Sequence, residues 1–269
     1  MTEMGDAKTF RRRLAAGEHL IGTFVKTPTS HATEILGALG FDFVVIDQEH
    51  APFDRVAIDT ALLAARAAGL AALVRVDSTA SILSALDCGA AGVLVPHVAS
   101  VTRAREAAAA CRYRGGRRGY SGSPRHAGYG AAGMAKTVEA ADAAVTVIAQ
   151  IEDPEALDEI DAIAAVEGID ALFIGRGDLA VALGAASSDA PQVRSAVERI
   201  GMAARRAGKP VSVFVGGMAE ASWLREQGAS AFVVASDQSF MRKAAAQALT
   251  ELRSLADTAR AEQQQGARE

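Results

Sequence analysis

The sequence GFDFVVIDQEH at residues 40–50 contains the pattern that decides the fold. Gly40 suits the left-handed residue that follows the last turn of a helix. The run Phe43–Ile46 is apolar throughout, as in a parallel strand that is buried on both faces. Polar residues follow at 47–50, where such a strand ends. A glycine, a short apolar strand and a polar end form one unit, and this unit recurs along the chain.

Short apolar or β-branched runs occur about eight times, with alanine-rich segments of helical character between nearly all of them. The predicted strands are Leu20–Val25, Phe43–Ile46, Ala72–Val76, Gly92–Val95, Val145–Ile151, Ala171–Ile174, Val211–Val215 and Ala231–Ala235. The glycines that we expect to end the preceding helices are Gly40, Gly69, Gly89, Gly208 and Gly228. Eight such units predict an α/β fold, a (β/α)₈ TIM barrel. A doubly wound sheet is disfavoured because the first turn, residues 26–29, lacks a glycine-rich phosphate loop.

Length and charge narrow the class of protein. The 269 residues fit one barrel domain over residues 1–258, followed by a charged, glutamine-rich stretch at 259–269 that we expect to be a flexible tail. The net charge of −4 gives no basic field for nucleic acid or an anionic membrane, so a small-molecule substrate is expected. Residues 1–13 lack the apolar core of a signal peptide, and two cysteines without metal-ligand spacing suit a reducing compartment. We therefore expect a cytoplasmic protein.

In barrels of this type, the chemistry lies at the carboxyl ends of the strands. Glu152 and Asp178 follow neighbouring predicted strands, and paired carboxylates suit Mg²⁺ or Mn²⁺ more than zinc. The alternative for this pair is a role in helix capping or surface salt bridges. Asp153 precedes Pro154, so we assign it to the N-cap of the next helix. Ser100 before Val101 is a second predicted cap.

Two further residues carry candidate chemistry. His50 could act as a general base, with Asp47 or Glu49 orienting its ring, and the alternative is a structural histidine. Arg75 lies within an apolar strand, where an uncompensated guanidinium would cost several kcal/mol, so it must face charge. That charge is either an oxyanion that develops during the reaction or a structural ion-pair partner. His97, just past the fourth strand, stays unassigned.

One segment, Arg112–Lys136, interrupts the alternation of strands and helices, and it is rich in arginine, glycine, serine and tyrosine. It is too long for an ordinary connection, so we expect an active-site loop. Its arginines could bind a distal carboxylate or phosphate, or could simply be solvated. A Schiff-base mechanism would need a lysine inside the barrel, and only Lys26 lies near the carboxyl end of a strand. Imine chemistry is therefore the weaker hypothesis.

Taken together, these segments resemble the HpcH/HpaI aldolase family, metal-dependent (class II) pyruvate aldolases of the phosphoenolpyruvate/pyruvate barrel superfamily. The resemblance covers roughly Leu20 to Gln238. It rests on the segments at 40–52, 74–76, 89–96, 118–119, 150–152 and 173–179, in this order and spacing.

The resemblance implies a role for each matching residue. Glu152 and Asp178 would bind a divalent ion, Mg²⁺, Mn²⁺ or Co²⁺, and Arg75 would steady the pyruvate enolate. His50, supported by Asp47, would serve in proton transfer.

The resemblance also implies that Gln150 lies on the substrate side and that the backbone around Gly177 cradles the pyruvate carboxylate. Asp87 matches an aspartate that the family presents near the site of a neighbouring subunit. With a C-terminal helix exchanged between subunits, this implies a homohexamer built as a trimer of dimers. The chain departs from the family in having Arg176 and His97 where many members have proline and methionine, which leaves specificity for the aldehyde open.

The activity implied is reversible retro-aldol cleavage of a 4-hydroxy-2-oxo acid to pyruvate and an aldehyde. The substrate would be of the 4-hydroxy-2-oxoheptanedioate or 2-keto-3-deoxy sugar acid type. One alternative is a CoA-ester lyase of the citrate or malyl type, which is disfavoured because the chain has Gly22-Thr23-Phe24-Val25 where that group has an Arg-Ser-x-Leu-x-x-Pro-Gly-like opening. Another is a non-catalytic barrel that binds a 2-oxo acid.

Overall fold

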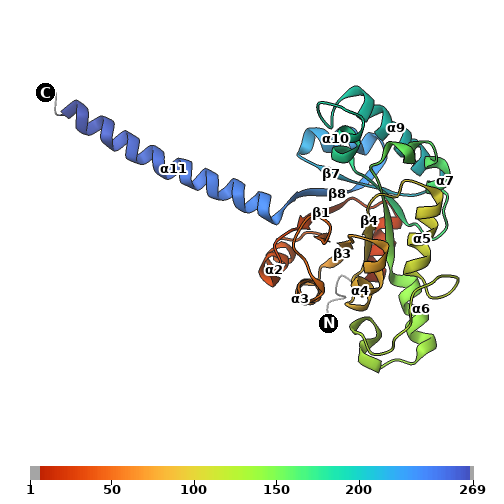
Figure 1. Cartoon of the computed structure of the whole chain (residues 1–269). Coiled ribbons are helices and arrows are strands. Elements are labelled where there is room, and N and C mark those ends of the chain that lie inside the picture. Colours follow the sequence, from red (N-terminus) through yellow and green to blue (C-terminus); the bar gives the residue numbers. More distant parts are fainter. Residues whose placement is uncertain (1–6, 267–269) are drawn as a thin grey trace.

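Eight parallel strands close into a barrel in the computed structural model, which describes residues 7–266 and their side chains as far as residue 254 (Figure 1). Each strand pairs with its neighbours in sequence, and β8 closes onto β1. The strands are β1 Leu20–Val25, β2 Phe43–Asp47, β3 Ala71–Arg75, β4 Gly92–Val95, β5 Thr146–Ile151, β6 Ala171–Ile174, β7 Val211–Val215 and β8 Ala229–Ser236. The predicted (β/α)₈ barrel is confirmed, and each predicted strand ends within two residues of an observed one.

Helices alternate with the strands around the outside of the barrel. They are α1 Ala7–Ala15, α2 Ser30–Ala38, α3 Arg55–Ala67, α4 Ile82–Asp87, α5 Val101–Cys111, α6 Met134–Ala144, α7 Ile160–Ala164, α8 Arg176–Ala182, α9 Pro191–Arg206, α10 Met218–Glu226 and α11 Asp237–Gly266, with short 3₁₀ turns η1 Thr79–Ser81, η2 Arg125–Gly130 and η3 Pro154–Leu157. The five predicted helix-ending glycines all have φ between 65° and 103°. Ser100 caps α5 as predicted, because its side chain accepts a hydrogen bond from the Arg103 N–H at 3.3 Å.

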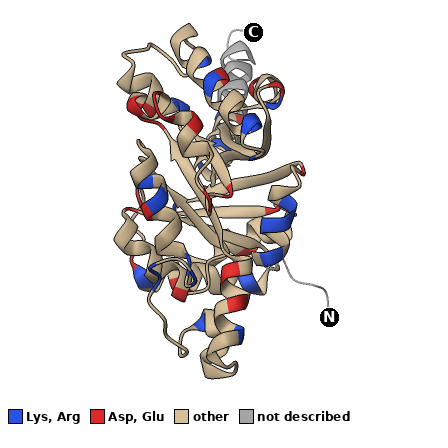
Figure 2. Ribbon diagram, turned by 90° about the vertical axis from the view of Figure 1, so that its right-hand side faces the viewer, with Lys and Arg blue, Asp and Glu red and all other residues tan. Residues whose placement is uncertain are grey.

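The strands contribute to two apolar layers, one inside the barrel and one beneath the helices. In β2, Phe43 and Val45 belong to the inner cluster, and Val44 and Ile46 belong to the outer one. Phe10 of α1 packs on Phe43 with ring centroids 5.2 Å apart, so α1 closes the amino-terminal end of the barrel. Charged residues lie mostly on the helices and near the strand ends (Figure 2). The opposite, carboxyl end is the mouth.

The segment between α5 and β5 lies at the amino-terminal end of the barrel, because it follows a helix and leads into the start of a strand. Its turn η2 packs against α4, and its helix α6 packs against α1. Within one chain, the prediction that Arg112–Lys136 forms an active-site loop at the mouth is therefore wrong. A segment that follows a helix returns to the opposite end of the barrel, and its polar composition does not change that.

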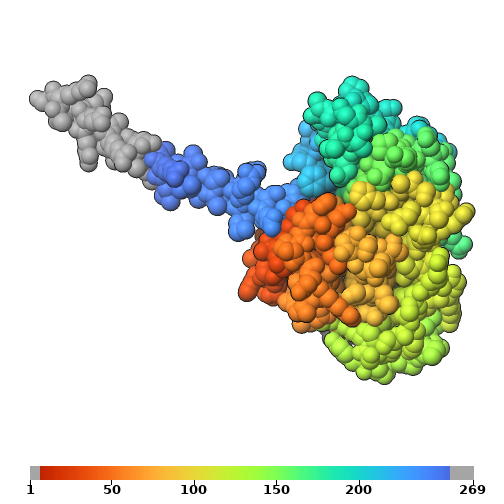
Figure 3. All heavy atoms as spheres, viewed as in Figure 1, coloured from red at the N-terminus to blue at the C-terminus, as the bar shows by residue number. Residues whose placement is uncertain are grey.

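Helix α11 stands clear of the barrel (Figures 1 and 3). Its first residue, Asp237, accepts hydrogen bonds from the backbone N–H groups of Lys26 at 2.8 Å and Thr27 at 3.0 Å. The helix continues to Gly266, past the predicted domain boundary at 258, and residues 267–269 lie outside the described chain. Among the described residues, no helix combines the length and apolarity needed to cross a bilayer.

Candidate active site

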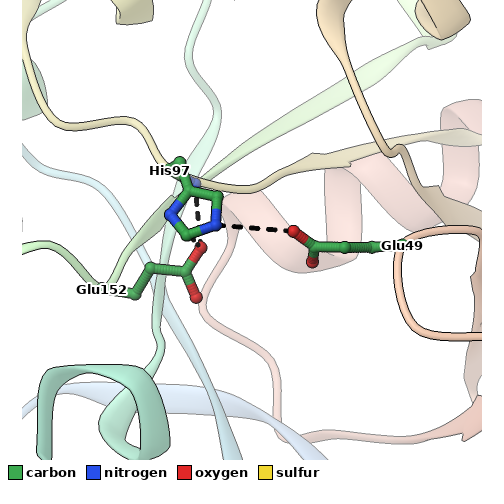
Figure 4. Close-up of side chains that lie close together, drawn as sticks. All are labelled: Glu49, His97 and Glu152. Carbon is green, nitrogen blue, oxygen red and sulfur yellow. Dashed lines mark hydrogen bonds and ion pairs between the residues drawn. The ribbon is translucent and has the colours of Figure 1, made fainter. Parts of the chain in front are cut away.

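Three side chains from different strand ends meet at the mouth of the barrel: Glu49 after β2, His97 after β4 and Glu152 after β5 (Figure 4). One potential ligand atom from each lies within 4.8 Å of the other two. His97 Nε2 is 3.6 Å from Glu49 Oε1, and His97 Nδ1 is 3.5 Å from Glu152 Oε1. Carboxylate and imidazole groups converging in this way form a candidate divalent-metal site.

Two backbone features hold Glu152 in this position. His97 has a left-handed φ of 52°, and its backbone N–H donates to Glu152 Oε1 at 2.8 Å. Behind the carboxylate lies Gly175, where a Cβ atom would stand 2.6 Å from Glu152 Cβ and 2.8 Å from its Oε2. Only glycine allows the β6 strand end to approach Glu152 this closely.

The buried carboxylate of Glu152 lies in an electrostatic environment that suits a cation. Its side chain is 1% exposed, and burial, with a further contribution from the charge of Asp178, raises the pKa of Glu152. The Gln150 amide and His97 oppose this effect without overcoming it. Gln150 Nε2 donates to Glu152 Oε2, while the buried Gln150 Oε1 has no partner among the described residues. A divalent cation would relieve the repulsion between the carboxylates of Glu152 and Asp178, so the residues present fit a divalent cation.

His97 is surrounded by carboxylates. Burial lowers its pKa, but Asp153, Glu152 and Glu49 together outweigh this effect, so the pKa of His97 is raised. Asp153 occupies the predicted N-cap position of η3, with Pro154 in the first turn, but its side chain makes no capping hydrogen bond. Its Oδ1 lies 3.1 Å from His97 Nδ1 instead, because the ring comes within reach from the β4 end.

Beside the three converging residues, Asp47 and Arg75 form a buried pair. Arg75 donates from Nε to Asp47 Oδ1 at 2.9 Å and from Nη2 to Asp47 Oδ2 at 2.7 Å. Burial raises the pKa of Asp47, but Arg75 and Lys26, whose Nζ is 3.0 Å from Oδ2, outweigh it and lower this pKa. Arg75 therefore faces charge as predicted, lies 4.7 Å over the Phe24 ring, and has its Nε 3.4 Å from Glu49 Oε2. Its guanidinium borders the candidate metal site.

The sequence profile of the HpcH/HpaI aldolase/citrate lyase family matches residues 20–244. The chain belongs to this family. It is 35% identical to the 5-keto-4-deoxy-D-glucarate aldolase of Klebsiella pneumoniae, over 87% of this chain and 93% of that protein. It is also 35% identical to the hydroxypyruvate/pyruvate aldolase of Paraburkholderia phytofirmans, over 91% and 97%. A crystal structure of an HpcH/HpaI aldolase/citrate lyase family protein from Burkholderia cenocepacia covers 91% of this chain and 99% of its own, with a TM-score of 0.86 and 34% identity. These named relatives support an aldolase of the HpcH/HpaI family, a carbon–carbon lyase.

Most residues that the HpcH/HpaI resemblance assigned to the site lie together at the mouth, but His50 differs from the prediction in detail. Its ring is 56% exposed, with Nε2 3.7 Å from Glu49 Oε2. Asp47 does not orient that ring: Asp47 Oδ1 accepts from the backbone N–H of His50 at 3.2 Å, because Arg75 and Lys26 occupy the carboxylate. Glu49 is therefore the carboxylate beside the His50 ring.

Three assigned residues lie outside the converging trio. Asp178 and Gly177 are exposed in the first turn of α8, and the charge of Asp178 is felt at Glu152. Asp87 ends α4 at the amino-terminal end of the barrel, where its Oδ1 is 3.5 Å from Arg118 Nη2 and 3.4 Å from the ring of His126. Its expected place beside a neighbouring subunit stays a prediction.

Sequence reasoning missed Glu49 and His97 as candidate ligands. From the sequence, Glu49 is expected only as a partner of His50, although it belongs to the same polar strand end. His97 directly follows Pro96 after β4, and its position past a strand end was the available signal. Arg176, which stands where many family members have proline, is 5% exposed, and its Nη2 lies 2.9 Å from Glu220 Oε1.

Proposed function

We propose that the chain is a divalent-metal-dependent aldolase that reversibly cleaves 4-hydroxy-2-oxo acids into pyruvate and an aldehyde. The observation that carries this proposal is the buried carboxylate of Glu152, which converges with Glu49 and His97 beside the Arg75–Asp47 pair. The named aldolases among the relatives support the reaction class.

We assign Glu152 to the metal as its central ligand and, on the resemblance, Asp178 as the second. Glu49 and His97 are close enough to complete the coordination or to border the ion. When bound, Mg²⁺, Mn²⁺ or Co²⁺ would polarise the keto group of the substrate. Loss of Mn²⁺ affinity in Glu152→Gln together with Asp178→Asn, but not in Glu49→Gln, would support the assigned pair.

The chain's own groups account for the charges and protons of cleavage. His50 accepts the proton of the C4 hydroxyl, the C3–C4 bond breaks to release the aldehyde, and the bond's electron pair becomes the enolate of pyruvate. Arg75 stabilises the negative charge on the C2 oxygen, because Asp47 holds its guanidinium in one orientation. His50, exposed and close to Glu49, exchanges the proton that the enolate carbon later takes up.

The substrate carboxylate is assigned to backbone N–H groups around Gly177, and the buried Gln150 Oε1 offers an acceptor without a partner among the described residues. Gln150 also fixes Glu152 through its Nε2. Binding and positioning therefore come from β5 and the start of α8, and charge stabilisation comes from β3.

The test is proton NMR of pyruvate in D₂O with the full-length protein, comparing EDTA-treated protein with protein given Mg²⁺, Mn²⁺ or Co²⁺. Loss of the methyl signal only with metal present would establish metal-dependent enolate formation, and an aldehyde screen would follow. The absence of exchange with every metal would contradict the proposal. In that case, cleavage of malyl-CoA or citramalyl-CoA would identify a CoA-ester lyase instead.

We also propose that the protein is a homo-oligomer, a hexamer built from dimers. Helix α11 projects from the barrel with Leu249 and Leu252 exposed by 50% and 68%. At its base, Phe240 and Met241 join Leu39, the residue after α2, around an apolar hollow of about 500 Å³. A second copy would remove this apolar surface from water. Light scattering should give six subunits, and a monomer at micromolar concentration would contradict the assembly.

A further inference from the structure

A cavity of about 520 Å³ lies at the amino-terminal end of the barrel, far along the strands from the mouth. One side is formed where α3 leads into β3 and α4 leads into β4, and the other by the segment containing η2 and α6. Much of the lining is small and apolar, and includes Leu62, Ala65, Leu70, Leu86, Ala90 and Ala141. Nothing in the proposed aldolase chemistry uses this cavity.

Arg118 brings a buried positive charge to this apolar space. Its side chain is 1% exposed, and its guanidinium carbon lies 4.6 Å over the ring of Tyr113. The nearest carboxylate oxygen, Asp87 Oδ1, is 3.5 Å from Nη2. Nε and Nη1 have no hydrogen-bond partner among the described residues. Buried donors without partners are costly, so these groups are poised to bind an acceptor.

Arg125 repeats the pattern on the same cavity. Its Nη2 donates to Asp59 Oδ2 at 2.7 Å, while Nε and Nη1 have no partner among the residues described. Arg66 also lines the cavity and makes no ion pair with any described residue. Arg118 and Arg125 therefore each contact one carboxylate, Asp87 and Asp59, and the exposed Arg66 adds a third positive charge to the lining.

The occupant must satisfy both halves of the lining. An anion is required by the free Nε and Nη1 groups of Arg118 and Arg125, and a planar carboxylate matches a guanidinium in shape. An apolar body is required by the alanine and leucine side chains, which inorganic phosphate would leave uncovered.

We propose that this cavity is a second binding site, separate from the mouth, for a short-chain aliphatic carboxylate. The carboxylate binds Arg118 and Arg125, and the alkyl chain lies against Leu62, Leu86 and Ala141. The site is independent of the metal, because it contains none of the residues that converge at the mouth.

The test is isothermal titration calorimetry of the full-length, EDTA-treated protein with acetate, butyrate, hexanoate and inorganic phosphate. EDTA removes any contribution of the metal to binding at the mouth. Each added methylene should tighten binding about fourfold, so hexanoate should bind roughly fifteen times more tightly than butyrate. Phosphate should bind weakly.

Three variants locate the binding. Arg118→Gln should weaken hexanoate at least tenfold, because it removes the buried charge. Ala141→Leu should exclude hexanoate by filling the cavity while leaving every charge in place. Arg117→Gln is the matched control, since Arg117 is exposed on the same segment and does not line this cavity.

Several results would overturn the proposal: no hexanoate binding, equal affinities for acetate and hexanoate, or unchanged binding in Ala141→Leu. If Arg118→Gln does not fold, Ala141→Leu decides the question alone.

Discussion

The two ends of the barrel each contain a buried arginine beside an aspartate, but the pairs are built differently. At the mouth, Arg75 donates to both oxygens of Asp47 at 2.9 and 2.7 Å. At the amino-terminal end, Arg118 contacts Asp87 through one atom at 3.5 Å, and its Nε and Nη1 have no described partner. A saturated guanidinium is held in place and acts through its charge. An unsaturated one retains donors for a ligand.

The difference originates in the backbone. Asp47 and Arg75 are register partners in the β2–β3 ladder, so their side chains leave adjacent strands at the same level. Arg118 lies in an irregular segment, and Asp87 ends a helix. A ladder fixes the bidentate geometry, whereas a helix end facing a loop leaves it open.

The largest effect is expected at the mouth, from Glu152→Gln. Removing this carboxylate should slow metal-dependent methyl-proton exchange on the order of 10³-fold, because several kcal/mol of metal-derived stabilisation is lost. The measurement is the proton NMR exchange rate with saturating Mn²⁺. Glu155→Gln, an exposed neighbour, is the control. Equal rates in the two variants would remove Glu152 from the metal site.

The comparison of the two arginines can be broken directly by measuring unfolding in urea. Arg75→Gln should lower the free energy of unfolding by about 3 kcal/mol, because Asp47 stays buried with only Lys26 as its cation. Arg118→Gln should cost about 1 kcal/mol or less, since one long contact is lost. Equal losses would show that the two pairs are energetically alike.

Gly175 and Gly177 allow a second comparison, within the mouth. Gly175→Ala should destabilise the protein by about 2 kcal/mol and weaken metal binding, because its Cβ would overlap Glu152. Gly177→Ala meets no atom within 4 Å, and should leave the stability unchanged or raise it by up to about 1 kcal/mol. Thermal unfolding without Mn²⁺ measures the change in stability, and the shift on adding Mn²⁺ measures metal binding. A stable, metal-binding Gly175→Ala would contradict this view of the site.

The smallest effect concerns pH at the amino-terminal end. Burial and the charge of Arg118 lower the pKa of His126 below its ordinary value of 6.5. The unfolded chain therefore binds the proton more tightly, and stability should fall as the pH drops below about 6.5. In His126→Gln this component is absent, so the difference in stability between pH 7.5 and 5.5 should shrink. Identical pH profiles in urea unfolding would contradict the assignment.

The sequence was sufficient to predict the barrel because each strand has a clear local signal. Runs such as Phe43–Ile46 are apolar on both faces and follow a left-handed glycine, and both signals are local. The polar composition of segment 112–136 suggests the mouth, but its position along the chain decides where it lies. It follows helix α5, and that order alone places it at the amino-terminal end.

The candidate site was predictable where the local sequence around one residue indicates its role. Arg75 in an apolar strand required a charged partner, and the structure supplies Asp47. The approach of His97 to Glu49 and Glu152 depends on the left-handed backbone after Pro96 and on three strands closing into one ring. Such a meeting is a property of the closed barrel rather than of any local segment.

The attachment of α11 has a mechanical consequence. Its first residue, Asp237, accepts hydrogen bonds from the backbone N–H groups of Lys26 and Thr27. The side chain of Lys26 holds Asp47, and Asp47 holds Arg75. A force on the projecting helix is thus transmitted through three successive polar links to the guanidinium at the mouth. A displacement at the base of α11 would therefore act on the contacts that position Arg75.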